Sequence, residues 1–190
     1  MERAEWLRGR EAFSHPAVRR YWSWLLGAYR PAAATALITP CSRVKPYTRS
    51  PASRKMRALL ARLGAWGDGG PVGVEWLYFS DLLLLVPYRM AEEYPACCYD
   101  VPPELVARSP RLRSTVVTLL AEALRRLRRM GVRDMVVFLP KKHLEMWMEA
   151  YSLADEKPSQ RLVGYTIYSF RGVAEALTPL IGEGRRGANG

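Results

Sequence analysis

Residues 40–55 carry a mixture of reactive and charged side chains, in the order PCSRVKPYTRSPASRK. Cys41 is a candidate nucleophile if nearby positive charge favours its thiolate, and Lys45 is a candidate ligand for phosphate or carboxylate, or an amine nucleophile. Tyr47 can stack on a nucleic-acid base, while Ser50 can cap a helix or bond to a phosphate. The same residues also fit a small buried cysteine in a stiff, solvated basic loop, and the residues alone leave both interpretations open.

The segments on either side of this loop predict where it lies. Residues 35–39 (TALIT) form a short apolar run bounded by turn signals, which is typical of a buried parallel strand. The apolar residues after the loop share one face of a helix, at Met56, Leu59, Leu60 and Leu63. Ligands of open α/β sheets bind at the carboxyl ends of the strands. The loop is therefore predicted to lie at a ligand-binding edge.

Strand-like and helical patterns alternate along the rest of the chain. Further strands are predicted at 72–80, 134–140 and 161–170, and further helices at 15–31, 111–131, 141–151 and 171–181. The segment 82–105 reads as a long connection interrupted by prolines. This alternation favours a three-layer α/β/α fold with a mostly parallel central sheet. We expect one domain over residues 1–182 and a disordered tail over 183–190.

The charge balance points to a polyanionic partner. Twenty-nine basic and eighteen acidic side chains give a net charge of +11 and an isoelectric point near 10.0. Such an excess is typical of nucleic-acid-binding proteins, although a thermophilic source or a GC-rich genome would also raise the arginine content. The longest apolar run, LLLLVP, is far shorter than the ~20 residues of a membrane span, and the N-terminus lacks the apolar core of a signal peptide. No association with a membrane is expected.

The three cysteines are Cys41 and the adjacent pair Cys97 and Cys98. This count is unlike the disulfide framework of a secreted domain, so a cytoplasmic location is expected. A bridge from Cys41 to either of the others stays open. Neither the cysteines nor His15 and His143 have zinc-finger spacing, so we predict no metal site and no cofactor.

The order Pro-Cys, three residues, Lys-Pro-Tyr, two residues, Ser resembles the signature of the archaeosine synthase family. That family modifies a base of tRNA and is related to archaeal tRNA-guanine transglycosylases. The matching residues are Pro40, Cys41, Lys45, Pro46, Tyr47 and Ser50. The family signature continues to a histidine, and this chain has Ser53 at that position.

A second segment, VPYRMAEEYPACCYDVP, is similar to another conserved stretch of the same family. Its counterparts in this chain are Glu92 or Glu93, Tyr94, Pro95, Tyr99 and Asp100. The two segments and the preceding helix extend over roughly residues 15 to 103. The resemblance implies the middle domain of a multidomain enzyme, with a three-layer fold like that of uracil-DNA glycosylase. A stand-alone relative of this kind is expected to act with a separate transglycosylase-like subunit.

The resemblance implies a reaction in which free lysine joins the nitrile of a deazaguanine in tRNA. Cys41 would add first and form a thioimidate, or Glu93 or Asp100 would act as base or ammonium anchor while Cys41 is structural. Lys45 completes the implied catalytic set. The substrate contacts would come from Tyr47, stacking on the extruded base, and from Ser50 and Tyr99.

The basic residues divide into two groups. The first would hold phosphates beside the site and consists of Arg43, Arg49 and Arg54, with Lys45. The second, Arg125 and Arg129 in the predicted helix 111–131, is either an RNA-facing stripe or a solvated face. His143 is expected to be a structural histidine more often than a catalytic one, and Asp100 has the alternative role of capping the segment PPEL.

Two further functions remain open from the sequence. A catalytically silent nucleic-acid-binding or partner module would use the same basic crevice, and Ser53 in place of the family's histidine favours it. A base-excising glycosylase has only the analogy of fold in its favour.

Overall fold

The computed structural model describes residues 5–166 and 170–186 of the chain. Its centre is a five-stranded sheet with the order β6-β5-β2-β8-β9. Strands β2 (Thr35–Pro40), β5 (Glu75–Ser80), β8 (Asp134–Val137) and β9 (Ser159–Leu162) run parallel, and β6 (Leu84–Pro87) pairs antiparallel with β5 at the edge. The sheet is therefore mostly parallel, as predicted.

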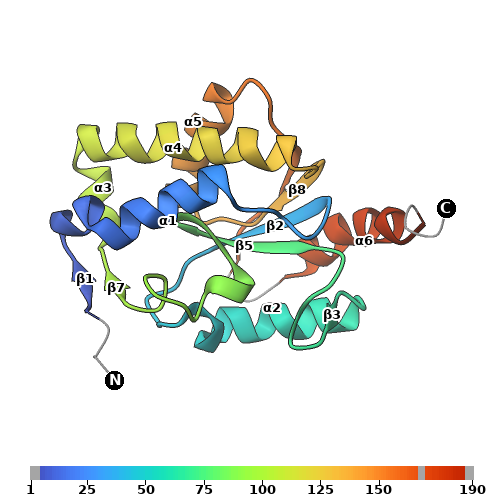
Figure 1. Cartoon of the computed structure of the whole chain (residues 1–190). Coiled ribbons are helices and arrows are strands. Elements are labelled where there is room, and N and C mark those ends of the chain that lie inside the picture. The colour runs from blue at the N-terminus through green and yellow to red at the C-terminus, as the bar shows by residue number, and fades with distance from the viewer. Residues whose placement is uncertain (1–4, 167–169, 187–190) are drawn as a thin grey trace.

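Helices cover both faces of this sheet (Figure 1). Helices α1 (Pro16–Gly27), α4 (Pro110–Arg129) and α5 (Lys141–Leu153) lie on one face, and α2 (Pro51–Arg62) and α6 (Arg171–Arg186) lie on the other. The predicted three-layer α/β/α class is confirmed, and the likeness to uracil-DNA glycosylase stays a prediction.

Smaller elements complete the described chain. Strand β1 (Leu7–Arg8) pairs in parallel with β7 (Tyr99–Asp100), and β3 (Trp66–Gly67) pairs with β4 (Gly70–Pro71). The short helix α3 (Pro103–Ala107) precedes α4. Three 3-10 turns are η1 (Arg10–Ser14), η2 (Tyr47–Arg49) and η3 (Tyr88–Met90).

Strand β5 shows how the sequence builds the two layers of core. Successive side chains of a strand point to opposite faces. Trp76 and Tyr78 face the α2 layer, where Tyr78 hydroxyl lies 3.0 Å from Ser53 Oγ. Phe79 faces the opposite layer and packs its ring against His143 and Trp147 of α5. All side chains of β5 are buried, which explains its apolar and aromatic composition.

Capping residues define where α1, α2 and α4 begin. His15 Nδ1 accepts a hydrogen bond from the Ala17 backbone N–H at the start of α1. Ser50 and Ser109 cap α2 and α4 in the same way, and each of these helices has a proline in its first turn. Gly131 follows α4 with φ of 97°, a left-handed conformation that suits glycine.

The structure corrects the sequence interpretation in two segments. The predicted connection 82–105 contains strand β6, whose side chains are all buried. The predicted last strand 161–170 differs from the structure, since β9 spans Ser159–Leu162, residues 163–166 form no strand, and residues 167–169 lie outside the described residues. Helix α6 extends to Arg186, and residues 187–190 of the predicted tail lie outside the described residues. Among the described helices, none combines the length and the apolar character of a membrane span.

Candidate functional site

A pocket of about 640 Å³ lies at the carboxyl ends of the three central strands, and we call it the strand-end pocket. Cys41 follows β2, Asp81 follows β5, and His143 lies in the first turn of α5, shortly after β8. These three side chains line the pocket together with Lys45, Tyr99 and Asp100. Neighbouring parallel strands end at the same edge of a sheet, and this order brings residues far apart in sequence together.

Asp81 and His143 form a nearly buried pair, with exposed fractions of 4% and 8%. His143 Nε2 lies 3.1 Å from Asp81 Oδ2. The other polar atom of each side chain, Asp81 Oδ1 and His143 Nδ1, is buried without a hydrogen-bond partner in the described part of the chain. Each side chain of the pair therefore has one polar atom with a hydrogen-bond partner and one without, which is uncommon for buried polar groups.

Cys41 is a free cysteine that is partly exposed at the pocket. Burial and the Asp81 carboxylate raise the pKa of the Cys41 thiol to about 11, and Lys45 opposes this shift only in part. The Tyr99 hydroxyl and the Asp81 backbone lower the pKa of the thiol only slightly. The thiol is consequently protonated at neutral pH, so nearby positive charge does not favour the thiolate that a nucleophilic Cys41 would need.

Lys45 lies between the pocket and the aromatic core. Its ammonium donates a hydrogen bond to the Ser42 carbonyl oxygen and sits 4.6 Å and 4.4 Å from the ring centres of Tyr47 and Tyr99. Burial lowers the pKa of Lys45, while the charges of Cys41 and Asp100 act in the opposite direction. The site thus holds a cation over two aromatic faces.

Tyr47 and Tyr99 form a chain of hydroxyl groups behind the pocket. Their hydroxyls are hydrogen-bonded to each other, and Ser80 Oγ lies 2.6 Å from that of Tyr99. Burial raises the pKa of both tyrosines well above the usual value. Tyr47 is completely buried, so its ring has no free face for a base. The expected stacking role of Tyr47 does not fit this placement.

Ser50 and Ser53 lie on the inner side of α2. Ser50 Oγ accepts a hydrogen bond from the Ser53 backbone N–H, so the capping role expected for Ser50 is the one observed. Ser53 Oγ lies 2.9 Å from Ser50 Oγ and 3.0 Å from the Tyr78 hydroxyl. The position of the family's histidine therefore faces the core next to Tyr78 rather than the strand-end pocket.

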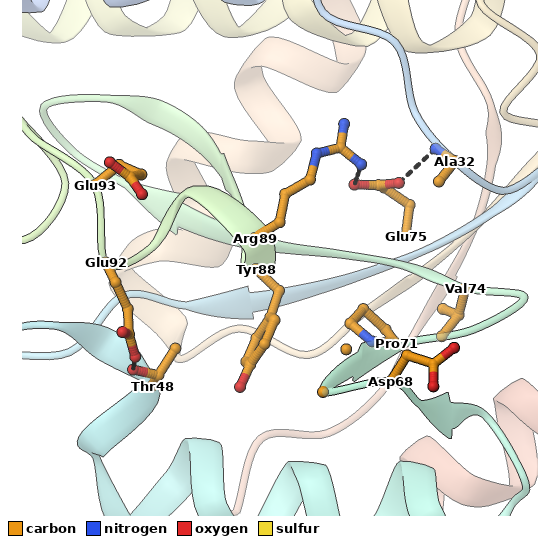
Figure 2. A pocket seen from close by; sticks show the side chains of 12 residues that line it. Ala32, Thr48, Asp68, Pro71, Val74, Glu75, Tyr88, Arg89, Glu92 and Glu93 are labelled. Atoms are coloured by element: carbon orange, nitrogen blue, oxygen red, sulfur yellow. Dashed lines mark hydrogen bonds and ion pairs between the residues drawn. The ribbon is translucent and has the colours of Figure 1, made fainter.

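Glu93 lies away from Cys41, at a second pocket that we call the acidic pocket (Figure 2). This pocket has a volume of about 480 Å³, and its lining includes Glu75, Arg89, Glu92 and Glu93. Glu92 accepts a 2.6 Å hydrogen bond from Thr48 Oγ1, whereas Asp100 lines the strand-end pocket. Of the two acids proposed as base, only Asp100 therefore shares a pocket with Cys41.

The basic residues are placed in two different settings. Arg43 is exposed and lines the strand-end pocket, and Arg49 and Arg54 are exposed nearby along the chain. Arg125 lies 2.6 Å from Asp155 and 2.7 Å from Glu122, and Arg129 lies 3.2 Å from Glu156. Arg125 and Arg129 of α4 are thus matched by acids, which reduces the positive field around these two residues.

The pocket contains Asp81, which the sequence analysis did not consider, and His143, for which a structural role was preferred to a catalytic one. Both follow a predicted strand within a few residues, as Cys41 does, and this common position is the signal that could have identified them. The remaining cysteines, Cys97 and Cys98, form a disulfide with each other, so neither bridges to Cys41.

A family model described as a domain of unknown function (DUF5591) matches residues 18–161 of the chain. Among curated proteins, the chain is similar to archaeosine synthase subunit alpha of Thermoplasma acidophilum, with 32% identity over 93 residues. That match covers 48% of this chain and 17% of the relative. The matched segment thus corresponds to a small part of the relative's length.

Among solved structures, the chain resembles the crystal structure of AF0587, a protein of unknown function. The TM-score is 0.51 at 16% sequence identity, with 84% of this chain and 49% of that chain covered. At this identity the likeness shows a common fold and carries no functional assignment.

Proposed function

The chain belongs to the family described as a domain of unknown function (DUF5591), and from this starting point we propose that it takes part in tRNA modification. In the proposed reaction a free amine such as lysine joins the nitrile of a deazaguanine in tRNA and forms an amidine. The similarity to archaeosine synthase subunit alpha supports this proposal. The net charge of +11 also supports it, because tRNA is a polyanion.

The observation that carries the proposal is the meeting of two sequence segments in one pocket. Cys41 and Lys45 come from the first segment that resembles the archaeosine synthase family, and Tyr99 and Asp100 come from the second. All four line the strand-end pocket. Residues more than fifty positions apart would not need to converge if the first segment were only a solvated loop.

The side chains of the pocket suit direct addition of an amine to the nitrile. The amine nitrogen bonds to the nitrile carbon while one proton moves from the amine to the nitrile nitrogen, so the reaction needs no electron transfer. Asp100, exposed at the pocket, would hold the incoming ammonium and accept its proton. Lys45 and the Tyr99 hydroxyl would donate toward the nitrile nitrogen.

Direct addition is favoured over a thioimidate intermediate because the Cys41 thiol is not activated. Burial and Asp81 hold its pKa at about 11, so the thiolate is scarce at neutral pH. In this proposal the thioimidate route needs a base for Cys41, whereas direct addition needs only the groups already named.

The RNA would lie across the exposed basic residues near the pocket, Arg43, Arg49 and Arg54. Each phosphate contact releases counterions. The logarithm of the association constant for tRNA should therefore fall linearly with the logarithm of the salt concentration, by roughly 0.7–0.9 per phosphate neutralised. Equal affinity at low and high salt would contradict a phosphate-dominated interface.

The reaction is tested with tRNA that carries the nitrile base and with isotopically labelled lysine. The full chain is assayed alone and with a separately encoded transglycosylase-like subunit, and the digested nucleosides are analysed by mass spectrometry. We expect a labelled amidine nucleoside, and a rate lower by about 100-fold or more in Asp100→Asn and Lys45→Met, as for loss of acid–base groups. Glu93→Gln is the matched control and should retain the wild-type rate.

The alternative is a catalytically silent RNA-binding module, which Ser53 in place of the family's histidine favours. Salt-dependent tRNA binding without labelled product, in the presence and absence of the second subunit, would establish that alternative. If Asp100→Asn formed the product as fast as the wild type, the proposed chemical role of Asp100 in the pocket would be wrong.

A further inference from the structure

Three different metal-binding side chains meet in the strand-end pocket. Cys41 offers a thiol sulfur, Asp81 a carboxylate oxygen and His143 an imidazole nitrogen, and one such atom from each lies within 4.8 Å of the other two. They follow three strands that are adjacent in the sheet, in the order β5-β2-β8. The fold, not a local motif, therefore assembles this group.

The buried polar atoms of this group are incompletely used. Asp81 and His143 share one hydrogen bond of 3.1 Å, yet Asp81 Oδ1 and His143 Nδ1 have no partner within the described residues. Buried polar atoms of native proteins are nearly always paired, so two orphans in one contact need an explanation. A ligand bound at this point would supply the missing partner.

We propose that Cys41, Asp81 and His143 bind one divalent cation of the zinc class. Sulfur, nitrogen and carboxylate oxygen are the donors that zinc accepts in proteins. Zinc bonds of about 2.0–2.3 Å mean that atoms already within 4.8 Å need side-chain shifts of only about 1 Å to share an ion. The site has three protein ligands and opens on the pocket, which is the pattern of catalytic rather than structural zinc.

The competing explanation is an acid–base pair in which His143 deprotonates Cys41. Among the described residues, no hydrogen bond joins the imidazole to the Cys41 sulfur, because His143 Nε2 lies against Asp81 Oδ2 and His143 Nδ1 has no partner. The Asp81–His143 contact also suits metal binding, because a nearby carboxylate fixes the orientation of a metal-binding histidine. The geometry therefore favours the cation.

The inference stands independently of the function proposed above, since it concerns binding alone. If the proposed reaction also holds, a cation at this position would polarise a nitrile that enters the pocket. If the protein binds zinc but forms no amidine, the metal site is supported and the proposed reaction is not. If it forms the amidine without binding zinc, the reaction is supported and the metal site is not.

The first experiment measures binding to the full chain prepared without a histidine tag. The chelated and dialysed protein is titrated with Co²⁺ and, separately, with Zn²⁺, and metal content is determined by mass spectrometry. We expect one ion per chain, competition of Zn²⁺ with Co²⁺, and the near-ultraviolet charge-transfer absorption of a cobalt–thiolate bond. Absence of saturable binding, or binding without the thiolate absorption, overturns the proposal.

The second experiment assigns the ligands. Cys41→Ser, Asp81→Asn and His143→Gln should each weaken Co²⁺ binding by more than about 100-fold, beyond the loss typical of a residue that only supports a ligand. The matched controls are the double substitution Cys97→Ser/Cys98→Ser and His15→Asn, which retains a side chain able to cap α1. Controls should bind as the wild type does, and loss of binding in them overturns the assignment.

A measurement on the unmodified protein covers the case in which a variant does not fold. Zn²⁺ should slow the alkylation of Cys41 by iodoacetamide, and a chelator should restore the rate. An alkylation rate that does not change with Zn²⁺ concentration overturns the proposal. Absence of metal binding together with slower alkylation in His143→Gln would also overturn it, in favour of the acid–base pair.

Discussion

Strand β5 has a buried carboxylate at each end, and the two differ in how they are satisfied. Glu75 is the first residue of the strand and Asp81 follows its last residue, and each is only 4% exposed. Both oxygens of Glu75 have partners: the Tyr29 hydroxyl at 2.7 Å and the Ala32 N–H at 2.6 Å. Asp81 keeps one oxygen without any partner in the described chain.

The two ends therefore have different tasks. At the amino end, the Glu75 network ties β5 to the segment after α1, and Arg89 lies 3.7 Å from the same carboxylate (Figure 2). At the carboxyl end, the two residues with unpaired atoms line the pocket that contains Cys41 and Lys45. Equal burial does not distinguish a structural acid from a ligand-binding one, but the completeness of its hydrogen bonds does.

The largest expected effect is on stability at the amino end. Glu75→Ala leaves the buried Tyr29 hydroxyl without an acceptor and removes the bond that holds the Ala32 N–H, which should lower the free energy of unfolding by about 2–4 kcal/mol. Urea denaturation followed by circular dichroism measures this loss. A loss no larger than that of an exposed residue would show that Glu75 is not the structural member of the pair.

The matched substitution at the carboxyl end should cost less. Asp81→Ala removes a buried unpaired oxygen but leaves the buried His143 Nε2 without its partner, so we expect a loss of only about 1 kcal/mol. The measurement is the same urea denaturation, with a chelator present to exclude metal effects. If Asp81→Ala is as destabilising as Glu75→Ala, the two carboxylates have the same structural task and the comparison fails.

A smaller, pH-dependent effect is expected for the cations of the two pockets. Burial lowers the pKa of Lys45, so the unfolded state binds its proton more tightly and Lys45 lowers stability at neutral pH. Lys45→Met should therefore raise the free energy of unfolding at pH 7. The gain should shrink as pH rises from the lowered pKa toward the unfolded-state value of about 10.4.

Arg89→Met is the control for that measurement. Arg89 has a side chain that is 48% exposed and lies beside Glu75, so its loss should cost less than about 1 kcal/mol and show no gain at neutral pH. Stability profiles from pH 6 to 10 compare the two variants. A Lys45→Met profile parallel to that of the wild type would contradict the burial of this ammonium.

The smallest effect is expected at Glu93, on the rim of the acidic pocket. Glu93 is exposed, so Glu93→Gln should change stability by less than about 0.5 kcal/mol. It should leave tRNA affinity unchanged, whereas Arg43→Gln should weaken affinity and reduce the salt slope by about 1. Filter binding at several salt concentrations compares the two. If only Glu93→Gln weakened binding, the RNA would have to contact the acidic pocket instead of Arg43.

Local patterns were sufficient for most elements of the fold. The apolar run at 35–39 and the helical faces of 15–31 and 111–131 correspond to β2, α1 and α4, because burial of one face leaves a periodic trace in the sequence. Strand β6 was missed, since a short continuous apolar run has no periodicity that distinguishes a strand from a buried connection. Strand β9 is mostly exposed, so its polar residues gave little signal.

The sequence by itself determined the class of fold, the basic charge and the edge of the sheet at which Cys41 and Lys45 lie. These properties depend on composition and on spacing along the chain, both of which are local. Only the tertiary structure decided that Asp81 and His143 join Cys41 and that Tyr47 is buried. It also placed Glu93 in a different pocket. The physical reason is that strand order depends on how the crossover connections pack, and no local pattern records which strand ends become neighbours.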